Sequence, residues 1–285
     1  MNKILAQVSR IIPDRLYLEI MYYHFFRKFM SFKNPKTYNE KLQWLKLYDR
    51  KPFYTQLVDK YEVKKYISNV IGEEYVIPTL GIWNSVDEID IKSLPDQFVL
   101  KTTHDSHGVE ICRDKNSFNI KKAKEYLNSR IKRNGFWYGR EWPYKNIKPR
   151  IIAEKYIGTK EIPNDYKFFM FDGKMDAVMV CTERETGKPQ FRFYDKNWNR
   201  LTYMPANLEP TTDVERPINF EMMVSLAETL SKGFLHIRVD LYNVDGNIYF
   251  GELTFFDACG FDTDILQEVD ERWGNLIKLP SHRIS

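Results

Sequence analysis

Residues 237–254 constrain the fold of this chain more than any other segment. Apolar residues alternate with other residues on both sides of the dipeptide Asp245-Gly246. Such alternation is typical of strands, and Asp-Gly between two strands is a strong signal for a two-residue hairpin turn. The segment therefore predicts two antiparallel strands joined at Asp245-Gly246.

The predicted hairpin gathers charged residues at one end of the ribbon. Pairing across the turn sets Asp240 near Glu252. Strand alternation lets Arg238 share a face with Asp240, and it lets Thr254 share a face with Glu252. Oxygen ligands of this kind suit Mg²⁺, and a guanidinium suits a triphosphate. The alternative is an ordinary hairpin with a cross-strand charge network, and the hairpin alone does not decide between the two.

Composition and charge exclude several classes of protein. The 285 residues include 43 basic and 39 acidic side chains, a balance that argues against a nucleic-acid-binding protein. No apolar run approaches the roughly 18 residues that span a bilayer, and residues 1–7 become polar too early for a signal peptide. Three cysteines without metal-ligand spacing predict free thiols. We therefore expect a cytoplasmic protein. Residues 4–30 are amphipathic in places but broken by Pro13, which leaves peripheral contact with the inner face of the membrane open, although a packing helix is the simpler interpretation.

The order of the predicted elements indicates an α+β fold. Residues 1–74 look helical, with a capping box from Thr37 to Glu40 and a second helix from Pro52 to Gly72. The remainder mixes short strands with single helices. We expect strands at residues 75–77, 97–103, 109–113, 150–157, 166–171, 174–182 and 190–194, and helices at residues 117–133 and 219–232.

A second group of candidate residues surrounds Lys101, which ends an apolar strand. The loop that follows contains Ser106 and Gly108 and leads into another strand. A small polar loop between two strands can fold over phosphates and offer them N–H groups and hydroxyls. Taken alone, a plain hairpin loop is the simpler interpretation. Lys60, on a predicted helix, taken alone indicates a solvated helix face.

A third candidate is Glu154, the one acid on the apolar strand that reaches Ile157. Such a strand can link two lobes, with the acid and the backbone of Tyr156 and Ile157 holding the edge of an adenine. The alternative is an edge strand with alternate exposed charges, which is the simpler interpretation without further context.

Taken in this order, the motifs resemble the ATP-grasp superfamily. The chain looks most like the TupA-like branch, named for teichuronopeptide biosynthesis, because residues 34–44 contain its Asn-Pro-Lys-Thr-Tyr-Asn-Glu-Lys-Leu-Gln-Trp segment. The similarity extends from there to Leu279-Pro280. The resemblance implies an ATP-grasp fold of two α+β lobes. They would be an N-lobe at residues 75–157 and a C-lobe with the metal hairpin at residues 158–285, after a helical N-terminal region at residues 1–74.

The resemblance also implies roles for individual residues. Asp240, Glu252 and Thr254 would be Mg²⁺ ligands, and Arg238 and Lys101 would be catalytic groups. Thr254 departs from the family, which usually has Asn there, and the loop before Gly108 contains less glycine than usual. The residues implied to bind ATP are Lys60, Lys101, Ser106, Gly108, Glu154, Tyr156, Ile157 and Lys167.

The reaction implied by the resemblance is amide formation. A carboxylate attacks the γ-phosphate of ATP to give an acyl phosphate and ADP, and an amine then displaces phosphate. The branch implies an amino acid or amine joined to a uronic-acid-containing surface polysaccharide of a bacterium, or to its precursor.

The aromatic and basic segment at residues 132–150 is a candidate acceptor site. Aromatic rings stack on sugar C–H surfaces and Arg can clamp a carboxylate. The substrate candidates are Trp137, Arg140 and Tyr144. A packed loop with solvated charges is the alternative. Single-stranded nucleic acid also fits such a segment, but the near-neutral chain argues against it.

Two other function classes stay open. A glycosyltransferase could use Asp262-Thr263-Asp264 to hold a metal and a nucleotide-sugar, although an Asp cap on a helix from Ile265 is the simpler explanation. An inactive ATP-grasp module could serve as a binding scaffold, but the retained lysines and carboxylates count against it. The oligomeric state is left open.

Overall fold

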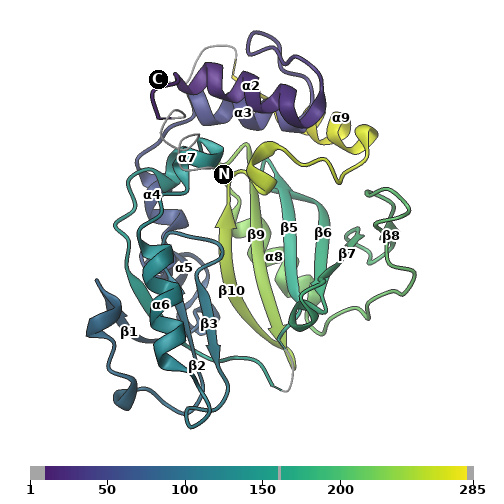
Figure 1. The fold of residues 1–285 in the computed structure, drawn as a ribbon. Coiled ribbons are helices and arrows are strands. Elements are labelled where there is room, and N and C mark those ends of the chain that lie inside the picture. Colours follow the sequence, from purple (N-terminus) through teal and green to yellow (C-terminus); the bar gives the residue numbers. More distant parts are fainter. Residues whose placement is uncertain (1–9, 160–161, 281–285) are drawn as a thin grey trace.

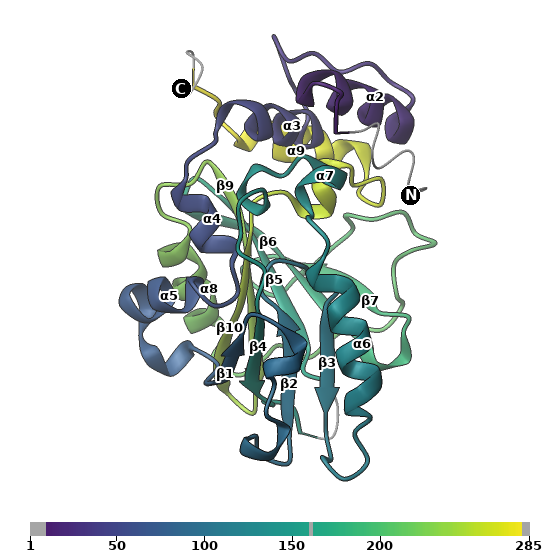
Figure 2. The same ribbon diagram turned by 60° about the vertical axis from the view of Figure 1, so that its left-hand side comes forward.

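The computed structural model of the protein describes residues 10–159 and 162–280. Two antiparallel sheets lie side by side, and a group of helices caps one end of both (Figures 1 and 2). The four-stranded sheet has the order β1-β4-β2-β3, and the six-stranded sheet has the order β10-β9-β5-β6-β7-β8. The α+β class predicted from the sequence is confirmed.

The four-stranded sheet has one face under a helix and one face toward the cleft. Phe98 and Leu100 pack with Leu127 of the covering helix in a small core. Strand alternation turns Val99 and Lys101 to the opposite face, where both line the cavity between the sheets. The elements are β1 (Thr79–Trp83), β2 (Phe98–Thr102), β3 (Val109–Cys112), β4 (Ile151–Lys155) and α6 (Ile120–Ile131).

The six-stranded sheet carries the larger core. Helix α8 packs on strands β5, β6 and β9. On the sheet, Phe169 stacks on Trp273, which is fully buried, and this packing accounts for part of the high aromatic content. The elements are β5 (Asp165–Phe171), β6 (Lys174–Thr182), β7 (Gln190–Tyr194), β8 (Arg200–Leu201), β9 (His236–Val244), β10 (Asn247–Thr254) and α8 (Phe220–Leu230).

The helices at one end join residues from both ends of the described chain. Helix α3 packs on α9, and the outermost helix is α2 (Figures 1 and 2). The capping box at α3 is confirmed, because Thr37 accepts from the backbone of Glu40 and Glu40 accepts from the backbone of Thr37. The helices at this end are α2 (Asp14–Phe26), α3 (Tyr38–Tyr48), α7 (Phe136–Gly139) and α9 (Gln267–Leu276), whereas α4 (Phe53–Val58) leads to α5 (Val63–Ile71), which packs on α8 (Figures 1 and 2).

The single helix predicted between residues 52 and 72 is wrong. The segment forms α4 and α5 with a break after Asp59, whose backbone is extended. The Asp59 carboxylate accepts from the backbone N–H groups of Tyr61 and Glu62, at 2.8 and 3.1 Å. Such a local bond competes with helix continuation, which explains the break.

Two further predicted elements differ. Residues 75–77 form no strand, and the 3₁₀ turn Glu73–Tyr75 precedes β1 instead. No Asp cap begins a helix at Ile265, because α9 begins at Gln267 and the Asp262 carboxylate accepts from the backbone of Asp264 at 2.9 Å. The other 3₁₀ turns are Val86–Glu88, Ile91–Ser93, Trp142–Tyr144, Arg184–Thr186 and Asp257–Gly260.

The fold bears on the cysteines and on membrane crossing. Cys112, Cys181 and Cys259 are free thiols, as predicted. Within residues 10–159 and 162–280, no helix has the length and apolarity needed to cross a membrane. Of the amphipathic stretch at residues 4–30, residues 4–9 lie outside the described residues.

Candidate functional site

The hairpin predicted from Asp245-Gly246 is present. Strands β9 and β10 are antiparallel and pair from Val244 opposite Asn247. Asp245 and Gly246 have φ of 50° and 84°, and two positive φ values are what a type I′ turn requires. The turn chemistry therefore explains why β9 and β10 pair directly with each other.

A bulge in β10 brings Glu252 opposite Asp240. Counting outward from the turn, a regular hairpin would pair Asp240 with Gly251 and leave Glu252 on the other face. The register shifts between Phe250 and Glu252, so that Asp240 pairs with Glu252. A Cβ atom on Gly251 would lie 3.0 Å from the backbone oxygen of Asp240, a close approach that favours glycine. The bulge thus places both carboxylates on one face.

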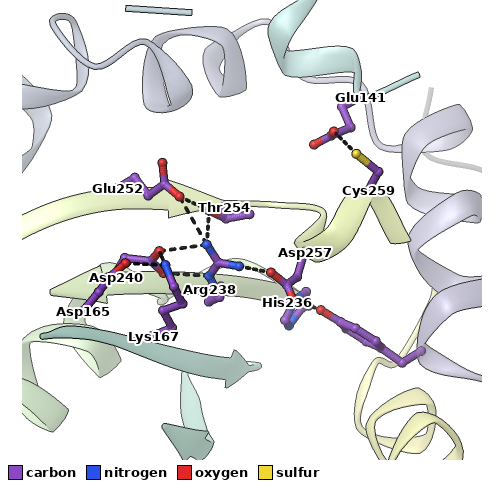
Figure 3. Close-up of polar contacts among 11 residues, drawn as sticks. Glu141, Asp165, Lys167, His236, Arg238, Asp240, Glu252, Thr254, Asp257 and Cys259 are labelled. Atoms are coloured by element: carbon purple, nitrogen blue, oxygen red, sulfur yellow. Dashed lines mark hydrogen bonds and ion pairs between the residues drawn. The ribbon is translucent and has the colours of Figure 1, made fainter. Parts of the chain in front are cut away.

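Arg238 lies among the charged side chains of the hairpin (Figure 3). Its Nε and Nη2 donate to the two carboxylate oxygens of Asp240 at 2.7 and 2.8 Å. Nη2 also donates to Glu252 Oε1 and Thr254 Oγ1, each at 3.2 Å, and Nη1 pairs with Asp257. Burial alone would lower the pKa of Arg238, but Asp240 outweighs it and raises that pKa. The guanidinium is a fixed positive charge beside the predicted metal ligands.

The neighbouring strand β5 adds a second cation to this face. Lys167 lies opposite Asp240 in the sheet, and its Nζ is 2.6 Å from the carboxylates of Asp240 and Asp165. Burial raises the pKa of Asp165 despite Lys167. For Asp240, by contrast, Arg238 and Lys167 outweigh burial and lower the pKa. Arg238 and Lys167 thus favour the ionised form of Asp240.

The facing wall of the cleft is centred on Glu154 of β4. Its two carboxylate oxygens accept ion pairs from Lys64 and Lys101, each at 2.6 Å. Burial would raise the pKa of Glu154, but Lys101 and Lys64 outweigh it and lower the pKa to about 2. A single buried carboxylate thus binds two ammonium groups, of which that of Lys101 lines the cavity.

The loop between β2 and β3 lies next to Lys60. The Lys60 Nζ donates to the backbone oxygen of Asp105 at 3.0 Å, so this lysine contacts the loop. Ser106 lines the cavity. Gly108 accepts from the backbone of Thr102 at 2.8 Å, and a Cβ atom on Gly108 would clash with the Thr102 hydroxyl. The loop therefore folds back tightly over the end of β2.

A cavity of about 240 Å³ lies between the two walls. It brings together residues that are far apart in the sequence and that come from both sheets. Sequence reasoning did not single out several of its lining residues, among them Asp165, Arg184 and Tyr242. The predicted residues that line it are Lys60, Lys101, Ser106, Glu154, Tyr156, Ile157, Lys167, Asp240 and Glu252.

The three predicted substrate residues have different surroundings. Arg140 is fully buried, with its guanidinium 4.1 Å from the centre of the Tyr17 ring and its Nε 3.0 Å from Asp14. Trp137 is partly exposed, and the Arg140 guanidinium also lies over its ring. Burial raises the pKa of Tyr144 well above its usual value, and the charges of Glu141 and Glu252 add to that effect. The pKa of Tyr144 is thus affected by the charge of a hairpin residue, Glu252.

Glu141 also lies close enough to Glu252 and Arg238 to sense their charges. Its carboxyl accepts from the Cys259 thiol at 3.0 Å (Figure 3). Burial raises the pKa of Glu141, although Lys46 opposes the change. Burial also lowers the pKa of Lys46 to about 8. Sequence reasoning counted Glu141 only as the single acid of a basic segment.

The donor set of the hairpin fits a hard divalent cation. Asp240, Glu252 and Thr254 provide carboxylate and hydroxyl oxygens on one face. Among the described residues no group of three or more His, Cys, Asp or Glu side chains is placed to hold a metal. Mg²⁺ does not require such a group, because it is usually held by one or two carboxylates together with the phosphates of its substrate.

Some residues of the site carried a sequence signal and others did not. Asp165 lies two positions before Lys167, a spacing that places both on one strand face. Lys64 lies in a Lys-Lys pair on a helix and looks solvated from sequence alone, so only the tertiary packing of α5 on the sheet reveals its ion pair with Glu154.

Comparison with solved structures finds ligases of low sequence identity. A D-alanine–D-alanine ligase from Bacillus anthracis is 15% identical, and the match covers 85% of this chain and 69% of that chain with a TM-score of 0.45. An L-amino acid ligase from Bacillus licheniformis is 11% identical, and the match covers 76% of this chain and 48% of that chain with a TM-score of 0.47. The ATP-grasp ligase PsnB, in complex with minimal precursor, Mg and ADP, is 11% identical. That match covers 76% of this chain and 57% of that chain with a TM-score of 0.39.

Comparison with protein families is more specific. No curated protein matches the sequence. The family model described as TupA-like ATPgrasp matches residues 40–278, which is most of the chain. The resemblance noted in the sequence is thereby confirmed, and the chain belongs to the TupA-like ATP-grasp family.

Proposed function

We propose that the protein is an ATP- and Mg²⁺-dependent carboxylate–amine ligase that forms an amide through an acyl phosphate and releases ADP. The observation that carries the proposal is the cavity of about 240 Å³ between a lysine-rich wall and an acidic wall. Family membership supports the ligase class. The nucleotide would lie between an N-lobe at residues 75–157 and a C-lobe at residues 158–285, with residues 1–74 as a helical N-terminal region.

The lysine-rich wall would hold the nucleotide. The backbone of Tyr156 and Ile157 would contact the adenine edge, at the end of the cavity that follows β4. Lys101 and Lys60 would contact phosphate oxygens, with Ser106 and Gly108 on the loop that covers them. Glu154 keeps Lys101 oriented through their ion pair of 2.6 Å, so the ammonium group is positioned before ATP binds.

The acidic wall would hold the metal and the reacting groups. Asp240, Glu252 and Thr254 would hold Mg²⁺, which neutralises phosphate charge when bound. Arg238 would stabilise negative charge that develops on the phosphoryl or acyl group, and its orientation is fixed by its bonds to Asp240. Lys167 would add a second positive charge on the same face.

For the substrates we propose an amino acid or amine and a carboxylate-bearing glycan. The support is the aromatic and basic composition of the segment before β4. Trp137 and Tyr144 would stack on sugar rings, whereas Arg140, which is fully buried and paired with Asp14, would hold the segment in place and not bind the substrate carboxylate predicted for it. We propose that the polymer is a uronic-acid-containing surface polysaccharide of a bacterium, or its precursor, and that the reaction takes place in the cytoplasm.

The experiment that tests the function is an ADP-release assay with a substrate panel. The purified protein is incubated with ATP, Mg²⁺, amino acids and uronic-acid glycans, and products are identified by mass spectrometry. We expect ADP release that requires both an amine and a carboxylate, together with an amide product. If the protein instead consumes a nucleotide-sugar and releases its nucleotide, it is a glycosyltransferase and the proposal fails.

A further inference from the structure

Helix α2 has two apolar faces, of which the protein covers one. Tyr17 is buried against the neighbouring helices, together with Leu18 and Tyr22. The other face carries Leu16, Ile20 and Tyr23, which are 48%, 51% and 43% exposed. Surface helices of globular proteins normally turn polar residues outward, so an exposed apolar stripe at helical spacing suggests a partner.

The apolar surface continues beyond both ends of α2. Ile11, before the helix, is 82% exposed, and Phe29, after it, is 86% exposed. The Phe29 ring stacks on Tyr23 with ring centres 4.9 Å apart, which joins it to the helical stripe. We call these five residues the outer face, which consists of Ile11, Leu16, Ile20, Tyr23 and Phe29.

The net positive charge of the chain is concentrated around the outer face. Residues 10–36 contain six Lys or Arg and two Asp or Glu, a net charge of +4, whereas the remaining residues contain 37 of each and have a net charge of zero. The two acids are already paired, Asp14 with Arg50 at 2.7 Å and Glu19 with Arg15 at 3.1 Å. The basic residues Arg10, Arg27, Lys28, Lys33 and Lys36 are all exposed, so the segment that carries the outer face presents a net positive charge.

A basic cavity lies beside the outer face. It has a volume of about 770 Å³ and lies between α2, the segment before α3 and the end of the described chain. The described residues that line it include no Asp or Glu. They include the cations Arg15, Lys33, Lys41 and Lys278 and the aromatic residues Phe32, Trp44 and Tyr48.

We infer that the outer face of α2 docks the protein on a membrane surface that contains anionic lipid. An apolar stripe flanked by Lys and Arg is the pattern of a helix that lies in the bilayer interface, where apolar side chains insert and basic ones attract lipid phosphates. The basic cavity would receive a headgroup. In both views α2 is the outermost layer of the molecule, so a flat surface can reach it (Figures 1 and 2).

A second copy of the chain fits this surface less well than a membrane does. A two-fold interface presents the same patch on both subunits, so it would bring the net +4 of residues 10–36 against itself. An anionic bilayer compensates that charge instead.

Co-sedimentation with lipid vesicles tests the inference. We expect the full chain to bind phosphatidylcholine vesicles that contain phosphatidylglycerol at least tenfold more tightly than phosphatidylcholine vesicles, with binding that weakens as salt rises. The triple variant Ile11→Ser, Ile20→Ser, Phe29→Ser should lose at least tenfold in binding. Its matched control is Ile218→Ser with Met222→Ser, which replaces exposed apolar residues elsewhere and should change binding by less than twofold.

A charge variant tests the same surface without changing its apolar residues. Arg27→Glu with Lys28→Glu should abolish the preference for anionic vesicles, whereas Lys121→Glu with Lys122→Glu, on exposed positions of α6, should keep it. The inference is overturned if the unmodified protein stays in the supernatant with anionic vesicles, or if the control variants lose as much binding as the test variants. It is also overturned if the triple variant converts a dimer to a monomer while vesicle binding is unchanged.

Discussion

The two walls of the cleft hold opposite surpluses of charge. On the four-stranded sheet one carboxylate, Glu154, lies between the ammonium groups of Lys64 and Lys101. On the six-stranded sheet the proportion is reversed, since Lys167 and Arg238 lie among four carboxyl groups, Asp165, Asp240, Glu252 and Asp257.

This difference indicates which part of a ligand each wall would take. Uncompensated charge is costly in a partly buried site unless a ligand completes it. A cationic surplus suits phosphate oxygens, and an anionic surplus suits a divalent metal. Substitutions on one wall should therefore affect a different step from substitutions on the other wall.

The largest effect is expected on the acidic wall. Glu252→Gln should lower kcat by roughly 100- to 1,000-fold, because it removes a charged ligand near the reacting phosphate. The free energy of unfolding should change by no more than about 1 kcal/mol, because the site has carboxyl groups in excess. ADP release and urea unfolding measure the two effects. Retained activity, or unfolding of the variant, would mean that the hairpin is a structural charge network. The matched control is Glu268→Gln, at an exposed position of α9.

The lysine-rich wall should produce a pH dependence of stability. Glu154 has a pKa of about 2 instead of 4.5, so its ionised form, held by the two lysines against the cost of burial, contributes about 3 kcal/mol to stability near neutral pH. The contribution is present above the unfolded-state pKa and is lost as pH falls toward 2, because the unfolded chain binds the proton first. Urea unfolding between pH 5 and pH 3 should show a smaller loss of stability in Glu154→Gln than in the unmodified protein. Equal losses would mean that Glu154 is not held ionised by the lysines.

A smaller effect is expected from one lysine of the same wall. Lys101→Met should weaken ATP binding by about 2 kcal/mol, or roughly 30-fold in Kd, since it removes a charge-assisted bond to phosphate. Isothermal titration calorimetry measures the change. Lys174→Met, at an exposed position at the start of β6, should leave the Kd unchanged. If both variants bind ATP equally well, Lys101 serves only to pair with Glu154.

The smallest effect is expected outside the two walls. Trp137→Ala should raise the acceptor KM severalfold, corresponding to about 1 kcal/mol of aromatic stacking, and leave the ATP Kd unchanged. Steady-state kinetics with the acceptor varied measures it, with Phe53→Ala as a control on an exposed ring. Loss of ATP binding in Trp137→Ala would place this segment at the nucleotide instead.

Most strands of the two sheets could be predicted from the sequence, because local patterns of residues specify them. Asp245-Gly246 can adopt two positive φ values, so the hairpin was predictable from two residues. The pairing register of the two strands was not predictable in the same way. Regular counting from the turn pairs Asp240 with Gly251, and only the bulge moves Glu252 opposite Asp240. A glycine inside a strand is the signal that permits such a bulge but does not require one.

Side-chain contacts decided the remainder, one of them local and one of them tertiary. The break at Asp59 depends on a side chain that bonds the backbone of Tyr61 in competition with the helix. The ion pair of Lys64 with Glu154 joins residues 90 positions apart, and no local pattern encodes it. Order of motifs along the chain was therefore more informative for the site than any single motif.

The most direct test of an ATP site between the two walls is the thermal midpoint of unfolding with ATP, in the presence and absence of Mg²⁺. A ligand that binds the native state raises the midpoint in proportion to the logarithm of its concentration over Kd. We predict a clear rise with ATP and Mg²⁺, a much smaller rise with ATP and EDTA, and loss of the Mg²⁺-dependent part in Glu252→Gln. An unchanged midpoint with ATP and Mg²⁺, together with a rise for a nucleotide-sugar and metal, would contradict the nucleotide assignment.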